Sequence, residues 1–371
     1  MKIVLSGVNL VEGGPLTVLK DAISSSANCE AITAVVCLVN DASLFGEHKL
    51  NPKVRFIEFP IVKRNWAFRV FFEYCYCYFL AMKIKPDFWF SLHDCTPFLP
   101  KQVTQSVYCH NPSPFYMPNV FDFRYDLKFV LFTMFYRFLY RININANKYV
   151  VVQQSFVRDF IKKMSPDMEV IVSHPLKKQP KEYKCKSKSK SNSIELVHFF
   201  YPALARTFKN HMVILEALKI IKSKSPEVLS SIRITLTLQP NGNRFNRFLC
   251  KAFSGYDCVD IVGLLSKDEV NTIYADAHAL LFPSKLETWG LPLSEAKSFD
   301  LPLIVSDLPY AKETIGDYDK VTFFDPNNPR ELAKIISDFV AGNINFGVNI
   351  LKSDSETCTS WAQLYDRLLK K

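Results

Sequence analysis

Two glutamates, Glu287 and Glu295, stand at the ends of a short segment whose residue types suit a phosphorylated, hydroxyl-rich ligand. Between them, Gly290 and Pro292 fit a loop that leads into the first turn of a helix. Such a helix start presents free backbone N–H groups and the positive end of the helix dipole. We therefore expect the backbone around Gly290 and Leu291 to bind a phosphate, with one carboxylate on either side.

The two carboxylates suit different parts of this ligand. Glu295 is expected in the first helical turn, where it would accept hydrogen bonds from ribose hydroxyls, and Glu287 would hold a transferred sugar. Alternatively, Glu295 only stabilises its helix N-terminus and Glu287 is a solvated loop residue. The glycine and proline between the pair favour the functional interpretation.

Two cations, Arg206 and Lys209, follow another apolar run, residues 194–200. Arginine binds a diphosphate with a bidentate fork and lysine as a point charge. A departing diphosphate gains charge, so such cations favour its release. Cations at a helix start oppose the helix dipole unless an anion is present, which argues against ordinary surface residues.

Short apolar runs alternate with helical stretches along the whole chain, which predicts parallel sheets covered by helices, an α/β fold. The strands predicted in the first half are 3–6, 34–39, 54–59, 88–92, 106–109 and 149–152. Those predicted in the second half are 194–200, 232–238, 259–262, 279–282, 303–305 and 321–323.

A Lys/Ser-rich stretch separates the two halves and predicts a solvated linker over 177–193, in preference to a nucleic-acid patch. We predict a Rossmann-like domain over 1–176 and a second over 194–352, with a ligand at the carboxyl ends of their strands. The residues 353–371 are expected to form a helix that packs back towards the N-terminal domain.

The formal charge of +10 favours anionic partners: nucleic acid, an anionic membrane or phosphorylated ligands. The linker lacks aromatic residues interleaved with its lysines, which disfavours nucleic acid. The N-terminus does not resemble a signal peptide, and the ten cysteines have no zinc-site spacing, so we expect a cytoplasmic protein with free thiols. No Asp-x-Asp motif follows a predicted strand, so we expect no metal and no cofactor.

The order and spacing of these residues resemble the retaining GT-B glycosyltransferases of family 4 over nearly the whole chain. Glu287-x7-Glu295 is similar to the E-x7-E motif of that family, and Arg206 with Lys209 is similar to its diphosphate-binding pair. The resemblance implies a GT-B fold, in which two Rossmann-like domains face each other across a cleft. It also implies retaining transfer of a sugar from a UDP- or GDP-sugar.

The resemblance assigns further residues in the N-terminal half. Gly13 and Gly14 match the family's glycine loop, near the donor phosphates and the acceptor, although the following Pro15 departs from many relatives. His110 is similar to the family's catalytic histidine, and the resemblance implies Glu287 as the second catalytic residue. Alternatively, His110 is a structural histidine.

Two more sets of residues follow from the same resemblance. Val262, Gly263 and Leu264 are expected to bind the nucleotide base through backbone groups. His93 and Asp94 form a second candidate set near the acceptor. In the implied reaction, the acceptor hydroxyl attacks from the face that the diphosphate leaves, and a phosphate oxygen takes its proton.

Aromatic residues crowd residues 66–79, and helical spacing predicts that most are core. The remainder, with Lys63, Arg64 and Arg69, would rest on a membrane surface. This favours a peripheral protein on the inner face of the cell membrane, whose acceptor is a lipid-diphosphate-linked O-antigen or polysaccharide intermediate.

Two other functions remain open at this stage. A sugar-nucleotide epimerase of GT-B fold would need an added acid/base set and no second sugar. A non-catalytic nucleotide- or polyanion-binding protein would account for the +10 charge alone.

Overall fold

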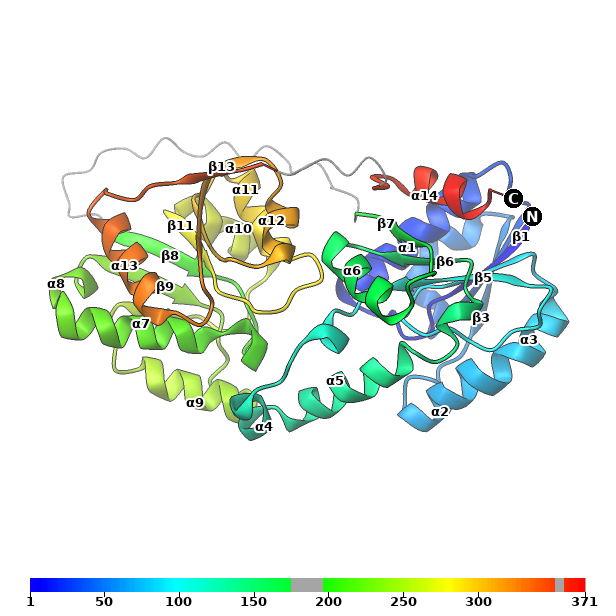
Figure 1. Ribbon diagram of the computed structural model, residues 1–371, viewed down its shortest axis with the longest axis horizontal. Helices are drawn as coiled ribbons and strands as arrows, with labels where there is room; N and C mark the ends of the chain where they lie inside the picture. The colour runs from blue at the N-terminus through cyan, green and yellow to red at the C-terminus, as the bar shows by residue number, and fades with distance from the viewer. Residues whose placement is uncertain (175–195, 351–356, 371) are drawn as a thin grey trace. The chain divides into compact units, whose positions relative to one another are not determined.

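The computed structural model describes residues 1–174, 196–350 and 357–370 (Figure 1). The predicted linker, 177–193, lies outside these described residues. Contacts divide the chain into two compact units: unit 1 contains Met1–Tyr116, Phe132–Leu176 and Asp354–Lys371, and unit 2 contains Met117–Leu131 and Lys177–Ser353. A short segment from the first half of the sequence thus belongs to the second unit, whereas the sequence predicted one continuous domain over 1–176.

Unit 1 is built on a seven-stranded sheet in which all neighbouring strands are parallel. The short apolar runs of the sequence form most of these strands, because side chains on both faces of a parallel sheet are buried. In sheet order its strands are β3 (Val54–Glu58), β2 (Ala34–Val39), β1 (Lys2–Ser6), β4 (Phe88–Ser91), β5 (Thr104–Cys109), β6 (Tyr149–Val152) and β7 (Val170–Val172).

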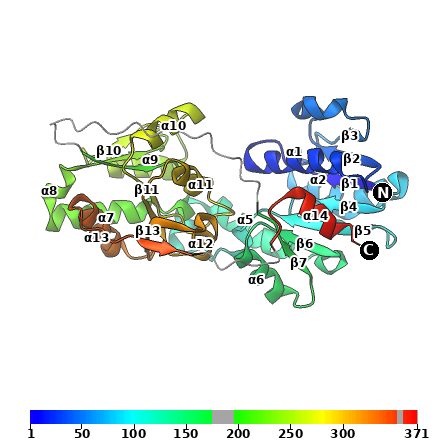
Figure 2. The ribbon, with the colours of Figure 1, turned by 90° about the horizontal axis from the view of Figure 1, so that it is seen from above.

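The helices of unit 1 cover this sheet, and the final helix of the chain belongs to it. Tyr365 of that helix donates a hydrogen bond to the carbonyl of Ala22 at 3.0 Å, so α14 lies beside α1 (Figure 2). The helices are α1 (Gly13–Asn28), η1 (Ala42–Leu50), α2 (Trp66–Phe71), the π-helical η2 (Phe72–Tyr76), α3 (Cys77–Ile84), η3 (Ser113–Phe115), η4 (Ile144–Ala146), α6 (Ser155–Met164) and α14 (Trp361–Leu368). The helices α4 (Val120–Tyr125) and α5 (Leu127–Leu139) carry the chain into unit 2 and back.

Unit 2 repeats the strand order of unit 1, except that its last strand is antiparallel. In sheet order its strands are β10 (Val259–Ile261), β9 (Ile232–Leu236), β8 (Val197–Tyr201), β11 (Ala279–Phe282), β12 (Leu303–Ser306), β13 (Tyr318–Phe324) and β14 (Gly347–Asn349). The connecting helices are η5 (Thr207–Lys209), α7 (His211–Lys224), α8 (Pro226–Leu229), α9 (Arg244–Phe253), α10 (Lys267–Asp276), α11 (Leu291–Ser298), α12 (Pro309–Ile315) and α13 (Pro329–Val340).

Both strand orders reverse at one point, between β1 and β4 in unit 1 and between β8 and β11 in unit 2. Open α/β sheets bind ligands at the carboxyl ends of the strands beside such a switch point. The fold therefore predicts that a ligand binds at the loops after these four strands.

The aromatic stretch is arranged differently from the prediction. Most of its rings are exposed, and the expectation that most are core is wrong: the exposed ones are Trp66, Phe68, Phe71, Tyr76, Tyr78 and Phe79. Arg69, expected on the surface, is buried instead, because it binds groups of unit 1. None of the described helices is both long enough and apolar enough to span a membrane.

Candidate functional site

The switch point of unit 2 brings two predicted residues into direct contact. Lys209 lies in η5 after β8, and its Nζ forms an ion pair with Oε1 of Glu287, in the loop after β11. Both side chains are largely buried, at 19% and 12% exposed. The hydroxyl of Tyr201, the last residue of β8, holds the Lys209 carbonyl at 2.7 Å. A cation and a carboxylate therefore stand together where an α/β sheet binds its ligand.

The loop after Glu287 leads into α11 as the sequence predicts. Gly290 stands directly before the helix with φ 76° and ψ 59°, a left-handed conformation that glycine adopts without strain. The side chain of Thr314 holds the carbonyl of Trp289, and Tyr310 donates to the carbonyl of Ser284 at 2.7 Å. These bonds fix the loop against α12, so the backbone at the helix start is preorganised.

Glu295 lies one residue further into the helix than expected. Because α11 begins at Leu291, Glu295 starts the second turn and is not in the first. It is therefore poorly placed to serve the helix dipole alone, an effect confined to the first turn. Its carboxylate pairs instead with Lys267 at 2.5 Å and lies 3.3 Å from the hydroxyl of Tyr274, both from α10.

The residues expected at the base follow β10. Val262 and Leu264 are exposed, and Gly263 between them has φ 77°. Arg206 precedes η5, and its Nη1 lies 3.2 Å from Oδ2 of Asp126, in the segment that unit 2 takes from the first half of the sequence. Sequence reasoning missed both Asp126 and Lys267, because nothing in their local sequence predicts these partners.

In unit 1, the predicted glycine loop opens α1. Gly13 has φ 64°, and Gly14 has no atom within 4 Å of the place where a Cβ would stand. The preceding Glu12 gives no side-chain cap to the helix. The backbone at the start of α1 is thus open on the side of Gly14, and the role of both glycines stays a prediction.

His110 directly follows β5, and its ring is buried in unit 1. Its Nε2 lies 2.8 Å from the carbonyl oxygen of Leu92, which only accepts, so Nε2 carries the proton. The side-chain amide of Gln153 lies 3.4 Å from Nδ1, and the ring stacks on Tyr108 at 4.4 Å. Burial lowers the pKa of His110, against a smaller opposing effect of Asp94. Burial therefore favours the neutral imidazole, and the catalytic role of His110 stays a prediction.

A buried polar cluster lies at the β1–β4 switch point. The sequence predicted His93 as a candidate residue there but did not single out Glu73. His93, after β4, lies 2.9 Å from Ser6 Oγ through Nε2 and 3.2 Å from Glu73 Oε1 through Nδ1. Arg69 donates to the His93 carbonyl at 2.7 Å. Burial raises the pKa of Glu73 to about 8, although Arg69 opposes it, and burial and Arg69 lower the pKa of His93. The sequence did not single out Glu73, and it placed Arg69 on a membrane surface, because both residues reach His93 only through the tertiary fold.

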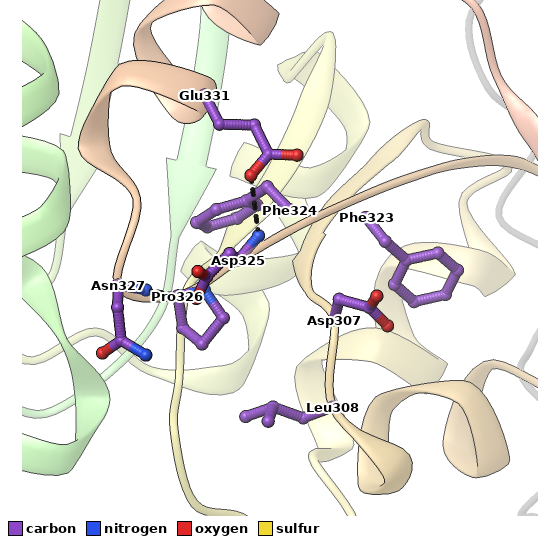
Figure 3. A pocket seen from close by; sticks show the side chains of 8 residues that line it. All are labelled: Asp307, Leu308, Phe323, Phe324, Asp325, Pro326, Asn327 and Glu331. Carbon is purple, nitrogen blue, oxygen red and sulfur yellow. Dashed lines mark hydrogen bonds between the residues drawn. The ribbon is translucent and has the colours of Figure 1, made fainter.

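A separate cavity of ≈ 370 Å³ lies at the carboxyl ends of β12 and β13 (Figure 3). Its acidic residues are Asp307, Asp325 and Glu331. They are engaged locally: Asp307 pairs with Lys312 at 2.6 Å, and Glu331 accepts the backbone N–H of Asp325 at 3.0 Å. Carboxylates repel a diphosphate, so this cavity does not compete with the predicted site. Among the described residues, no group of three or more His, Cys, Asp or Glu could hold a metal ion.

Comparisons with known proteins agree with this architecture. Residues 183–349 match the family model of "Glycosyl transferases group 1". The O-antigen chain mannosyltransferase RfbU of Salmonella typhimurium is 25% identical over 248 residues, which are 65% of this chain and 64% of that relative. The match thus spans less than two thirds of that relative's length.

Two solved structures share the fold over nearly the full chain. The lipopolysaccharide outer core galactosyltransferase WaaB has a TM-score of 0.60 at 14% identity, covering 93% of this chain and 92% of its own. HepE of Anabaena, solved in complex with UDP-glucose, has a TM-score of 0.56 at 11% identity, covering 99% and 95%. The fold is therefore GT-B. The group 1 match, residues 183–349, lies within unit 2 of this fold.

Proposed function

We propose that this protein transfers a sugar, with retention of configuration, from a UDP- or GDP-sugar to a saccharide acceptor. The observation that carries the proposal is the Lys209–Glu287 ion pair beside the start of α11, at the switch point of unit 2. A nucleoside-diphosphate sugar offers a diphosphate to the cation and helix start, and sugar hydroxyls to the carboxylate.

Each part of the donor then has a partner in unit 2. Arg206, Lys209 and the N–H groups around Gly290 and Leu291 would bind the diphosphate. Glu295 would hold the ribose and Glu287 the sugar, and the backbone at 262–264 would read the base. The complex of HepE with UDP-glucose supports a donor of this class.

The reaction needs no group outside this site and the two substrates. The bond between the sugar anomeric carbon and the diphosphate breaks, and the acceptor hydroxyl forms its bond on the same face. The proton of that hydroxyl passes to a phosphate oxygen. The two cations and the dipole of α11 stabilise the charge that the leaving diphosphate gains, so we propose that no metal is required.

We further propose that the acceptor is a lipid-diphosphate-linked O-antigen or polysaccharide intermediate at an anionic membrane. The name of the relative RfbU, O-antigen chain mannosyltransferase, supports an acceptor of this kind. Trp66 packs edge-on against Phe135 at 5.0 Å, which joins α2 to α5 within unit 1. The exposed aromatic and methionine side chains of α2, α3 and the unit 1 part of α5 are here called the aromatic face: Trp66, Phe68, Phe71, Tyr78, Phe79, Met82, Met134, Phe135 and Phe138. Exposed Lys63 and Arg64 precede it, and this combination suits an interface with anionic lipid.

The test is a transfer assay with a panel of UDP- and GDP-sugars and synthetic lipid-diphosphate-linked saccharides. Mass spectrometry is expected to find an acceptor heavier by one sugar, with the donor's anomeric configuration by NMR. An inverted product would reject retention. Conversion of the sugar nucleotide to its epimer, without any transfer, would establish the epimerase instead.

A further inference from the structure

Asp126, which no sequence motif singles out, contacts a cation of the proposed donor site. It stands between α4 and α5 and uses its two carboxylate oxygens differently. Oδ1 accepts the backbone N–H of Phe129 at 3.2 Å and so caps the start of α5. Oδ2 lies 3.2 Å from Nη1 of Arg206. Asp126 is 10% exposed and Arg206 is 46% exposed, so the carboxylate is the fixed partner and the guanidinium the adaptable one.

Aromatic packing holds this segment in unit 2 independently of the ion pair. Tyr125 contacts Phe248 of α9 at 5.0 Å between ring centroids. Phe129 contacts Phe208 at 4.8 Å, and Phe208 is the residue before Lys209. The position of Asp126 is therefore set by rings on both sides, and the same packing braces the loop that carries both cations.

The contact leaves most of the arginine's binding capacity unused. A guanidinium has five N–H donors in a planar fork, and Asp126 contacts it through Nη1. An arginine side chain that is nearly half exposed loses considerable rotamer entropy when it binds a ligand. A carboxylate that already restrains Arg206 reduces this loss and leaves the other donors for a phosphate.

We propose that Asp126 is a positioning residue of the donor site, which holds Arg206 ready for the donor diphosphate. This inference rests on the proposed function. A counter-ion that merely occupies Arg206 until the donor arrives would have the opposite effect on affinity, because its removal would tighten binding. The sign of the change therefore separates the two roles.

The informative variant is Asp126→Asn. Asparagine caps a helix as well as aspartate does, so α5 is kept while the charge beside Arg206 is lost. We expect the dissociation constants of UDP and GDP, measured by calorimetry, to rise about tenfold for whichever nucleotide the wild type binds, as for the loss of one hydrogen bond to a charged group. The matched control is Asp159→Asn, which removes an exposed carboxylate that pairs with Arg158 in unit 1.

A double-mutant cycle excludes a merely structural effect. In an Arg206→Ala background, Asp126→Asn should change nucleotide affinity no further, because the proposed effect of Asp126 passes through Arg206. Unchanged or tighter binding by Asp126→Asn alone, or an equal loss in the Arg206→Ala background, would overturn the inference. Wild-type protein that binds neither nucleotide would instead overturn the proposed function. Loss of binding in Arg206→Ala without loss in Asp126→Asn would overturn the positioning role alone.

Discussion

Lys209 and Glu287 are separated by 78 positions in the chain, and their side chains form an ion pair at the carboxyl ends of β8 and β11. Each would be costly to bury alone, and each partly neutralises the other. A diphosphate beside Lys209 and a sugar beside Glu287 would use the same two charges. The ion pair therefore offsets the cost of burying both charges and would let each group turn to a donor.

Replacing Gly290 with alanine should damage both stability and donor binding. At φ 76° a Cβ would stand 3.3 Å from Leu293 Cδ1 and 3.7 Å from Glu287 Cγ. We expect a loss of about 1–2 kcal/mol from the left-handed conformation and a higher donor KM. Gly255→Ala is the control, because no atom lies within 4 Å of its Cβ position. Equal urea-unfolding midpoints for the two variants would contradict this prediction.

The pKa of Glu73 predicts how stability depends on pH. Burial raises it to about 8 from 4.5, so the folded protein holds a proton that the unfolded chain has released. This contribution to stability is complete below pH 4.5 and is lost as the pH rises through 8. Glu73→Gln cannot ionise, so its stability relative to wild type should increase across this range.

Urea unfolding at several pH values between 4.5 and 8 measures this effect. The neighbouring Arg69 and His93 stay in place in the variant, which isolates the carboxyl group. A constant difference between wild type and Glu73→Gln over the range would show that Glu73 is ionised in the folded protein.

Charge on the aromatic face should weaken binding to anionic vesicles. Phe79 and Phe138 are 68% and 62% exposed, so the double change to glutamate should leave the core intact. We expect reduced sedimentation with vesicles that contain phosphatidylglycerol at low salt. Leu50→Glu, at another exposed site of unit 1, is the control. Equal binding of both variants, or no binding by the wild type, would contradict the proposed contact with an anionic membrane.

Chelation should leave transfer unaffected. The proposed charge neutralisation comes from Arg206, Lys209 and the start of α11, so activity in EDTA should equal activity in buffer. Complete loss in EDTA that manganese restores would assign this task to a metal ion.

The sequence was sufficient wherever the chemistry is local. The loop and helix around Gly290 and the cations after β8 were predicted because strand, turn and helix signals follow each other directly. The strands β7 and β14, of three residues each, were missed, whereas the equally short β10 was predicted from residues 259–262.

Pairings across long distances could not be predicted. Asp126 reaches Arg206, and Glu73 reaches His93, only through the tertiary fold. Glu73 lies in the short π-helix η2, an irregularity that the helical spacing of the sequence did not predict. The place of Glu295 in the second turn depends on where α11 begins, and a sequence locates helix ends poorly.

The most direct test of the account compares sugar transfer by wild type, Lys209→Ala and Lys219→Ala. Lys219 is an exposed lysine of α7 that pairs with Glu216, so its removal changes charge alone. Lys209→Ala should lower turnover about a hundredfold or more, as expected when a group that stabilises transition-state charge is lost. Lys219→Ala should match the wild type. Unchanged turnover in a folded Lys209→Ala protein would contradict the central claim that the donor diphosphate binds at the β8–β11 switch point.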